Sequence, residues 1–192
     1  MIEIVLASSN AHKVKEINAI ANAHGINFVK VKEGFDPVED GETFEANSAI
    51  KAKAASVLMK TYALADDAGL CVDELDGRPG IYSARYAPTQ AEKIAKLLDE
   101  LKNKPDNKRT AHFVCSMTLT NANGDIVHTT KGICNGKIAH SPYGNGGFGY
   151  DPIFIVDSLN KTMAEFSLDE KNTLSHRAKA LLPMIEWIKS NL

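Results

Sequence analysis

The chain has 192 residues, of which 44% are hydrophobic and 24% charged, a balance typical of a globular protein, and one domain over residues 1–192 is expected. Its 22 Lys and Arg residues against 24 Asp and Glu give a formal charge of -2, which argues against nucleic acid or an anionic membrane as a partner. The sequence has no apolar run of roughly 20 residues and no secretory signal pattern, so a cytosolic protein is expected.

The first segment predicts a strand that runs directly into a helix. Residues 2–7 are mostly apolar with β-branched members, and serine and asparagine, which are strong helix N-cap types, follow at once. Apolar residues then recur at helical spacing up to Gly25, which predicts a C-terminal stop. A second strand is predicted over residues 26–31.

A long helix is predicted after the acidic stretch 34–42. Its predicted apolar face consists of Phe44, Ala46, Ile50, Ala54, Val57 and Leu58. The short apolar run 62–65 then predicts a buried strand that ends at two aspartates.

The middle of the chain predicts a helix and a hairpin. Thr89 and Glu92 form a capping-box pattern ahead of an apolar helical stripe. Residues 110–120 alternate apolar and polar side chains, and an Asn-Gly turn separates them from a return strand over 126–138.

The last part predicts a loop, a strand and a helix. Residues 141–150 include a proline and four glycines and predict an ordered functional loop or a flexible connector. A strand over 153–156 follows, and Ser175 opens a final helix. Strands and helices without a linker between them predict an α/β fold with a mixed sheet.

The turn after the first strand is a candidate phosphate site. A strand that ends in small polar residues and starts a helix presents unpaired backbone N–H groups and the positive end of the helix dipole. The alternative is a plain N-cap with a solvated lysine. The candidate residues are Ser8, Ser9, Asn10, Ala11, His12 and Lys13.

Asp66 and Asp67 are a candidate catalytic or metal-binding pair. Adjacent carboxylates at the end of a buried strand repel each other and lose hydration, a cost that a cation or a catalytic proton transfer can offset. Oxygen ligands of this kind suit Mg²⁺, and Glu39 and Asp40 in the preceding acidic loop could complete the site. The alternatives are an Asp-initiated turn at the sheet edge and, for Glu39, a solvated charge run.

Two further segments are candidates for substrate binding. In the glycine-rich loop, Phe148 could stack on a nucleobase while Asp151 or backbone groups bond to the base edge; the alternative is a hairpin connection whose aromatics cover the core. Near the C-terminus, Lys171 is followed by His176 and Arg177 at a helix start. Because that end of a helix disfavours cations, an anion or a carbonyl acceptor is expected there, with a surface salt bridge as the alternative.

Together these segments resemble the inosine triphosphate pyrophosphatase family, in the same order along the whole chain. Each block is weakly specific alone, whereas the combination is highly specific. The matching residues are Ser8, Asn10 and Lys13; Gly41, Thr43, Phe44, Asn47 and Lys51; Ala65, Asp66, Asp67, Gly69 and Leu70; Gly77 and residues 79–86; residues 146–152; and Lys171, Ser175, His176 and Arg177.

The resemblance implies an elongated central mixed sheet flanked by helices, two lobes with a nucleotide in the cleft between them, and a homodimer. It also implies Mg²⁺-dependent hydrolysis of a nucleoside triphosphate to the monophosphate and pyrophosphate. By position, Asp67 corresponds to the general base and a metal-associated carboxylate, and Glu39 to a further metal ligand. The implied substrate-contacting residues are Ser8, Ser9, Asn10, Ala11, His12, Lys13, Lys51, Ala68, Phe148, Gly149, Tyr150, Asp151, Lys171, His176 and Arg177.

The chain departs from the family pattern at two positions. Ala46 stands where the family commonly has Glu, and Glu45 precedes it; adjacent helix positions point about 100° apart, so Glu45 cannot simply substitute. Ala68 stands where many relatives have Ser. Activity is expected to survive both changes.

Three functions are compatible with these residues. A purine 6-carbonyl would accept hydrogen bonds from His176 and Arg177, whereas the 6-amino group of adenine would leave them unpaired, which favours inosine and xanthosine triphosphates over ATP. The alternatives are a pyrophosphatase for pyrimidine or modified nucleotides and a nucleotide-binding sensor without turnover.

Overall fold

One mixed β-sheet of six strands carries the fold in the computed structural model, which describes residues 2–192. β1 pairs in parallel with β2 and β3, and the pairs β3–β4, β4–β5 and β5–β6 are antiparallel, so the predicted mixed α/β sheet is confirmed. In the order in which they lie across the sheet, the strands are β2 (Ile26–Lys30), β1 (Ile2–Leu6), β3 (Ala63–Val72), β4 (Thr110–Thr120), β5 (Ile126–Ile138) and β6 (Phe154–Val156).

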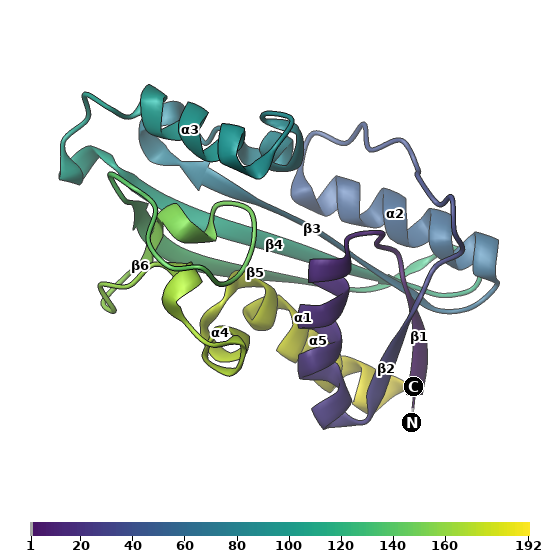
Figure 1. Cartoon of the computed structure of the whole chain (residues 1–192). Coiled ribbons are helices and arrows are strands. Elements are labelled where there is room, and N and C mark those ends of the chain that lie inside the picture. The colour runs from purple at the N-terminus through teal and green to yellow at the C-terminus, as the bar shows by residue number, and fades with distance from the viewer. Residues whose placement is uncertain (1) are drawn as a thin grey trace.

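Helices cover both faces of this sheet. α2 and α3 lie on one face and α1, α4 and α5 on the other, as Figure 1 shows. Among residues 2–192, no helix is both long and apolar enough to cross a membrane. The helices are α1 (Ala11–Ala21), α2 (Phe44–Met59), α3 (Gln90–Glu100), α4 (Leu168–Leu174) and α5 (His176–Asn191).

The hairpin and the capping box are the parts that follow the sequence pattern most closely. β4 and β5 begin and end at the predicted residues, because both the alternation and the Asn-Gly turn are local signals. Thr89 and Glu92 form the predicted capping box at the start of α3. Helix α4 was not predicted, although Ser167 and Glu170 form a capping box at its start as well.

The predicted apolar face of α2 is correct at Phe44, which is buried, and wrong at Val57 and Leu58. Val57 and Leu58 are 55% and 49% exposed, whereas the buried face carries Ser48, Lys51 and Ala52. Polar groups of β4 lie beneath this face: Ser48 Oγ and Thr118 Oγ1 are 2.8 Å apart, and Thr120 Oγ1 donates to the Ala52 carbonyl at 3.0 Å. The polar partners that decide which face is buried come from a distant strand.

The strand that carries the two aspartates is longer than predicted. β3 pairs with β4 over its whole length from Ala63 to Val72, so Asp66 and Asp67 lie inside the strand and not at its end. β1 pairs only with Ala63 and Leu64 of β3. The pairing of β1 with β3 therefore ends just before Asp66 and Asp67. A cleft opens at this point.

Gly132 of β5 sets how closely α5 packs on the sheet. A Cβ at this position would lie 2.1 Å from the His176 carbonyl oxygen and 2.5 Å from the Ala180 backbone nitrogen. We expect Gly132→Ala to lower the free energy of unfolding by about 1–3 kcal/mol, as overpacked cores do, although Gly→Ala in a strand is otherwise favourable. Urea denaturation measures this, and a variant at least as stable as wild type would contradict the close packing.

Candidate nucleotide site

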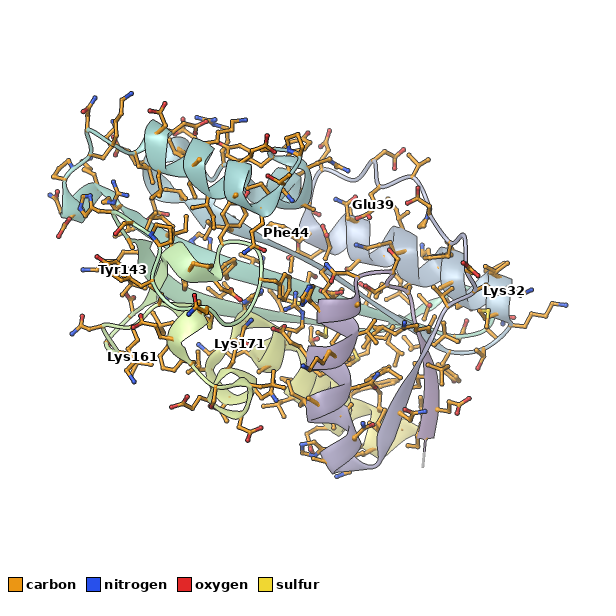
Figure 2. All side chains as sticks on the ribbon, in the orientation of Figure 1. Lys32, Glu39, Phe44, Tyr143, Lys161 and Lys171 are labelled. Atoms are coloured by element: carbon orange, nitrogen blue, oxygen red, sulfur yellow. The ribbon has the colours of Figure 1, made fainter. Side chains whose placement is uncertain are left out.

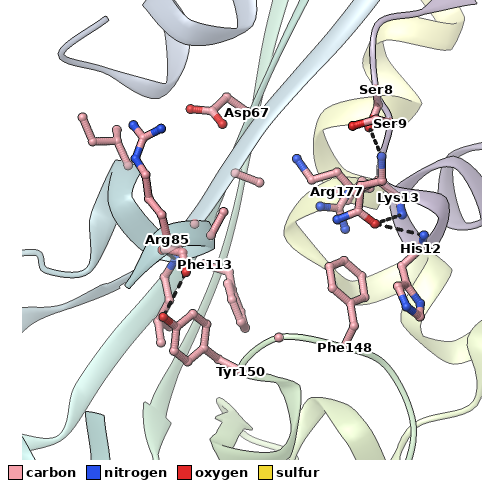
Figure 3. A pocket seen from close by; sticks show the side chains of 18 of the residues that line it. Ser8, Ser9, His12, Lys13, Asp67, Arg85, Phe113, Phe148, Tyr150 and Arg177 are labelled. Atoms are coloured by element: carbon pink, nitrogen blue, oxygen red, sulfur yellow. Dashed lines mark hydrogen bonds between the residues drawn. The ribbon is translucent and has the colours of Figure 1, made fainter. Parts of the chain in front are cut away.

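A cavity of about 430 Å³ lies where α1, α2, β3, α3, α4 and α5 approach one another, a volume suited to a small-molecule ligand. In Figure 2, Glu39 and Lys171 come from opposite sides of the sheet. Figure 3 shows Asp67, Arg85 and Tyr150 on one wall and Ser8, Lys13 and Arg177 on the other.

The cavity gathers nearly all of the predicted site residues. Ala11 and Asp66 are the two that do not line it. The predicted residues that do are Ser8, Ser9, Asn10, His12, Lys13, Glu39, Lys51, Asp67, Ala68, Phe148, Gly149, Tyr150, Asp151, Lys171, His176 and Arg177.

Asn10 caps α1 at the mouth of the cavity. Its side-chain oxygen accepts from the backbone N–H of His12 at 3.0 Å and of Lys13 at 3.3 Å. For the backbone N–H groups of His12 and Lys13, the alternative interpretation of this turn, a plain helix N-cap, is therefore correct. Lys13 is not solvated, however, because its Nζ lies 3.0 Å from Asp66 Oδ2.

Asp66 and Asp67 do not form one site, which corrects the prediction that the pair binds a single metal ion. Successive side chains of a strand point to opposite faces. Asp66 faces α1 and α5, where Lys13 and Arg177 outweigh the opposing effect of burial and hold the pKa of its carboxyl well below the ordinary value. Asp67 faces α2, where its Oδ1 lies 3.4 Å from Lys51 Nζ.

Asp67, Glu39 and Lys51 form a compact charged cluster on the α2 side. Glu39 Oε2 lies 2.9 Å from Lys51 Nζ, so both carboxylates share this ammonium group. Burial raises the pKa of Asp67 despite the opposing effect of Lys51, which makes this carboxylate a stronger base than a solvated one. Burial lowers the pKa of Lys51, but the carboxylates of Asp67, Asp66 and Glu39 outweigh it and raise the pKa overall.

This cluster fits a divalent cation better than the aspartate pair does. Asp67 Oδ2 is buried without a hydrogen-bond partner within residues 2–192, and Glu39 supplies a second carboxylate beside it. Two carboxylates with water and phosphate oxygens are the donor set that Mg²⁺ prefers. No group of three or more His, Cys, Asp or Glu side chains is arranged for a metal across the part of the chain that the structure describes, so substrate oxygens would have to complete such a site.

Glu16 of α1 holds the opposite side together, and no pattern singled it out beforehand. It is 7% exposed, accepts from Lys171 Nζ at 2.6 Å and pairs with a guanidinium nitrogen of Arg177. Its position four residues before buried Ile20 was the available signal, since a charged residue on the inner face of a helix needs partners. Lys171 also donates to Asp151 Oδ2 at 2.7 Å, so this lysine is already neutralised by protein carboxylates.

The glycine-rich loop presents Phe148 to the cavity. The ring stacks on His12 with centroids 5.2 Å apart, and Lys171 Nζ lies 5.1 Å from the Phe148 ring centroid. Asp151 Oδ2 accepts from the Phe148 backbone N–H at 2.9 Å, so the Asp151 side chain supports the loop. Gly147 has φ +69°, and a Cβ there would lie 2.0 Å from Asp151 Oδ2. A residue with a side chain would therefore not fit at this position.

His176 is buried at the start of α5 against Phe113, with ring centroids 4.7 Å apart. Burial, aided by Arg177 and Lys171, holds the pKa of His176 well below its ordinary value of 6.5, so the ring is neutral. Its Nδ1 and Arg177 Nε have no hydrogen-bond partner within residues 2–192. His176 and Arg177 line the cavity together with Phe148.

The neutral His176 ring predicts a loss of stability in acid. Because the folded pKa is depressed, the unfolded chain binds a proton that the folded chain does not once the pH falls below about 6.5. Between pH 7.5 and 5.5 we expect wild type to lose about 1 kcal/mol more than His176→Phe, which keeps a stacked ring without the titration. Urea unfolding at both pH values measures the difference, and equal losses in the two proteins would contradict a neutral buried His176.

Both the sequence and the fold of this chain are similar to those of known proteins. The profile of the Ham1 family matches residues 4–187. The dITP/XTP pyrophosphatase of Geobacillus kaustophilus is 45% identical over 97% of this chain and 94% of that protein, and the dITP/XTP pyrophosphatase of Bacillus subtilis is 45% identical over 99% and 98%. The solved structure of a HAM1 protein from Coxiella burnetii is 40% identical with a TM-score of 0.88, covering 99% of this chain and 100% of that one.

Proposed function

The chain belongs to the Ham1 family, and from that premise we propose that it hydrolyses the non-standard purine nucleoside triphosphates ITP, dITP and XTP to the monophosphate and pyrophosphate. Such an activity removes these nucleotides before they enter DNA or RNA. The resemblance to the inosine triphosphate pyrophosphatases is confirmed at the level of the family, and the fold is that of the solved Ham1 structures.

The observation that carries this function is the placement of Asp67. It lies in the cavity wall beside Glu39 and Lys51, across the cavity from Lys13 and the start of α1. A raised pKa suits a general base, which works best when its pKa is near the operating pH. One wall thus supplies a base, and the other presents to the phosphates the Lys13 ammonium group, which is paired with Asp66.

In the proposed reaction, Asp67 orients a water molecule and accepts its proton. The water oxygen forms a bond to the α-phosphorus while the bond from that phosphorus to the bridging oxygen breaks, and pyrophosphate leaves. Lys13 and Lys51 stabilise the charge that develops on the phosphate oxygens. Phe148 stacks on the base and holds the α-phosphate at the level of Asp67.

Glu39 and Asp67 are the residues that would hold Mg²⁺. The ion supplies charge neutralisation at the triphosphate when bound. We expect EDTA in excess to abolish pyrophosphate release and added Mg²⁺ to restore it. Without the ion, the carboxylates of Glu39 and Asp67 repel the triphosphate. Turnover that persists in EDTA after exhaustive dialysis would contradict a metal requirement.

Base selection follows from two buried nitrogens of residues that line the cavity, one on the neutral His176 ring and one on the charged Arg177 guanidinium. His176 Nδ1 and Arg177 Nε lack partners within residues 2–192, and a 6-carbonyl of hypoxanthine or xanthine provides an acceptor. Adenine offers an amino donor at the same place and leaves the protein groups unpaired. A site built to bond a substrate group rejects the analogue that lacks it.

A nucleotide panel tests this function against its two rivals. Purified protein with Mg²⁺ is incubated with ITP, XTP, dITP, GTP, ATP, UTP and dTTP, and pyrophosphate and orthophosphate are both quantified. The proposal expects pyrophosphate from dITP, ITP and XTP at much higher kcat/KM than from ATP. A preference for UTP or dTTP indicates the pyrimidine enzyme, and binding without turnover indicates the sensor.

The resemblance also implies a homodimer, which we propose as the working form in the cytosol. The protomer has a mass of 20.8 kDa. Light scattering on the purified chain should give about twice that mass, and a monomer at micromolar concentration would contradict the proposal.

A further inference from the structure

Four cations around the cavity, from α1, α2, α4 and α5, are already matched by carboxylates. Lys13 pairs with Asp66, Lys51 with Glu39 and Asp67, Lys171 with Glu16 and Asp151, and Arg177 with Glu16 and Asp66. These are four cations against five carboxylates, a formal excess of one negative charge. A triphosphate therefore finds little uncompensated positive charge among these four side chains.

Arg85 and Lys93 are different, because they line the cavity without any carboxylate within 4.0 Å in the chain from residue 2 to residue 192. Arg85 is exposed, and its guanidinium lies 5.4 Å from the centroid of the Tyr82 ring. Lys93 lies in the first turn of α3, one turn from Gln90, whose Oε1 accepts from the Gly149 N–H of the loop that carries Phe148. Lys93 thus belongs to the end of the cavity that holds the base.

Arg85 lies at the other end. A second groove adjoins the cavity, and the two share Glu39, Ile81 and Arg85 as lining residues. Figure 3 shows the Arg85 side chain directed toward the end of the cavity where Asp67 lies, opposite Lys13 and Arg177. A nucleotide whose base stacks on Phe148 and whose α-phosphate lies at Asp67 extends its remaining phosphates toward Glu39 and Arg85.

The turn that carries Arg85 is fixed to the catalytic strand. Ser83 Oγ accepts from the Leu70 N–H at 2.9 Å and donates to the Gly80 carbonyl at 2.6 Å, while Tyr150 donates to the Ser83 carbonyl at 3.1 Å. At Gly69, two residues after Asp67, a Cβ would lie 2.4 Å from the Gly80 carbonyl oxygen. The backbone of the turn therefore has a defined place relative to Asp67, while the Arg85 side chain remains free to bind.

From these positions we propose that Arg85 binds the β- and γ-phosphates, the part of the substrate that leaves as pyrophosphate. A guanidinium presents a planar fork of donors that matches two phosphate oxygens, and no carboxylate of residues 2–192 lies within 4.0 Å of the Arg85 guanidinium. Arg85 is thus a substrate-binding residue that acts from the wall opposite Lys13. This role rests on the proposed pyrophosphatase function.

Inhibition by pyrophosphate and inhibition by dIMP report separately on the binding of the two ends of the substrate. For Arg85→Gln we expect the KM for dITP to rise about 10- to 100-fold with kcat within about threefold, as loss of a charge-assisted hydrogen bond to a substrate implies. Inhibition by inorganic pyrophosphate with Mg²⁺ should weaken by a similar factor, and inhibition by dIMP should stay within about twofold. Arg85→Lys should be intermediate, because it keeps the charge and loses the fork.

Arg78→Gln is the matched control, since Arg78 is 57% exposed, lines only the adjoining groove and loses the same charge. It should behave as wild type. The proposal is overturned if Arg85→Gln binds pyrophosphate as wild type does, or if dIMP inhibition weakens equally. If wild type releases no pyrophosphate from any nucleotide, the proposed function fails separately, and calorimetry with inorganic pyrophosphate still decides whether Arg85 binds it.

Discussion

Replacing Asp67 by Asn is expected to lower kcat by about 10²- to 10⁴-fold while the fold and substrate binding persist, which is the range of a general base contribution. The amide has the shape of the carboxylate but cannot take the proton of the attacking water. Lys51 keeps Glu39 as a partner at 2.9 Å, so the local structure does not depend on Asp67 alone. Pre-steady-state measurement of dIMP formation gives the rate of the chemical step.

Asp73→Asn provides the control for this substitution. Asp73 follows directly after β3, its side chain is 59% exposed, and it does not line the cavity. It makes the same chemical change just beyond the end of the same strand without touching the site, so its kcat should equal that of wild type. If Asp67→Asn turns over at a rate near wild type, Asp67 is not the base.

Replacing Glu16 by Ala is expected to cost about 3–5 kcal/mol of unfolding free energy, the range for removal of one partner from a buried ion cluster. Lys171 and Arg177 are both buried and both pair with Glu16, so its loss leaves two cations short of a partner. For a chain of this length, that corresponds to a fall in Tm of roughly 6–20 °C. Thermal unfolding followed by circular dichroism measures the shift.

Glu186→Ala serves as the reference, because Glu186 is exposed on α5 and has no salt bridge within residues 2–192. Its Tm should stay near that of wild type. Glu16→Gln, which keeps the size and one carbonyl acceptor, should be intermediate. A Glu16→Ala protein that unfolds at the wild-type temperature would show that the cluster is not a source of stability.

The parts of the fold that the sequence predicted well are those governed by neighbouring residues. The β4–β5 hairpin follows from alternation and an Asn-Gly turn, and the start of α3 from a capping box. The parts that it predicted poorly depend on distant partners. The inner face of α2 is polar because Thr118 and Thr120 of β4 lie under it, a pairing that no spacing within residues 44–59 reveals.

The site shows the same division. Nearly all of the site residues predicted from local motifs and family resemblance line the cavity, but the ion pairs among them were not predicted. Asp66 and Asp67 are neighbours in sequence and face different sides of the sheet, since the aspartates lie inside a strand. Glu16 was missed because its partners, Lys171 and Arg177, are more than 150 residues away along the chain.

In the proposed reaction, water activated by Asp67 attacks the α-phosphorus of a non-standard purine nucleotide. Hydrolysis of dITP in ¹⁸O-labelled water, followed by ³¹P NMR, tests it most directly because the label marks the phosphorus that was attacked. We expect the label to appear in dIMP and unlabelled pyrophosphate to be the only other phosphorus product. Label in pyrophosphate, or release of orthophosphate with dIDP, would contradict it.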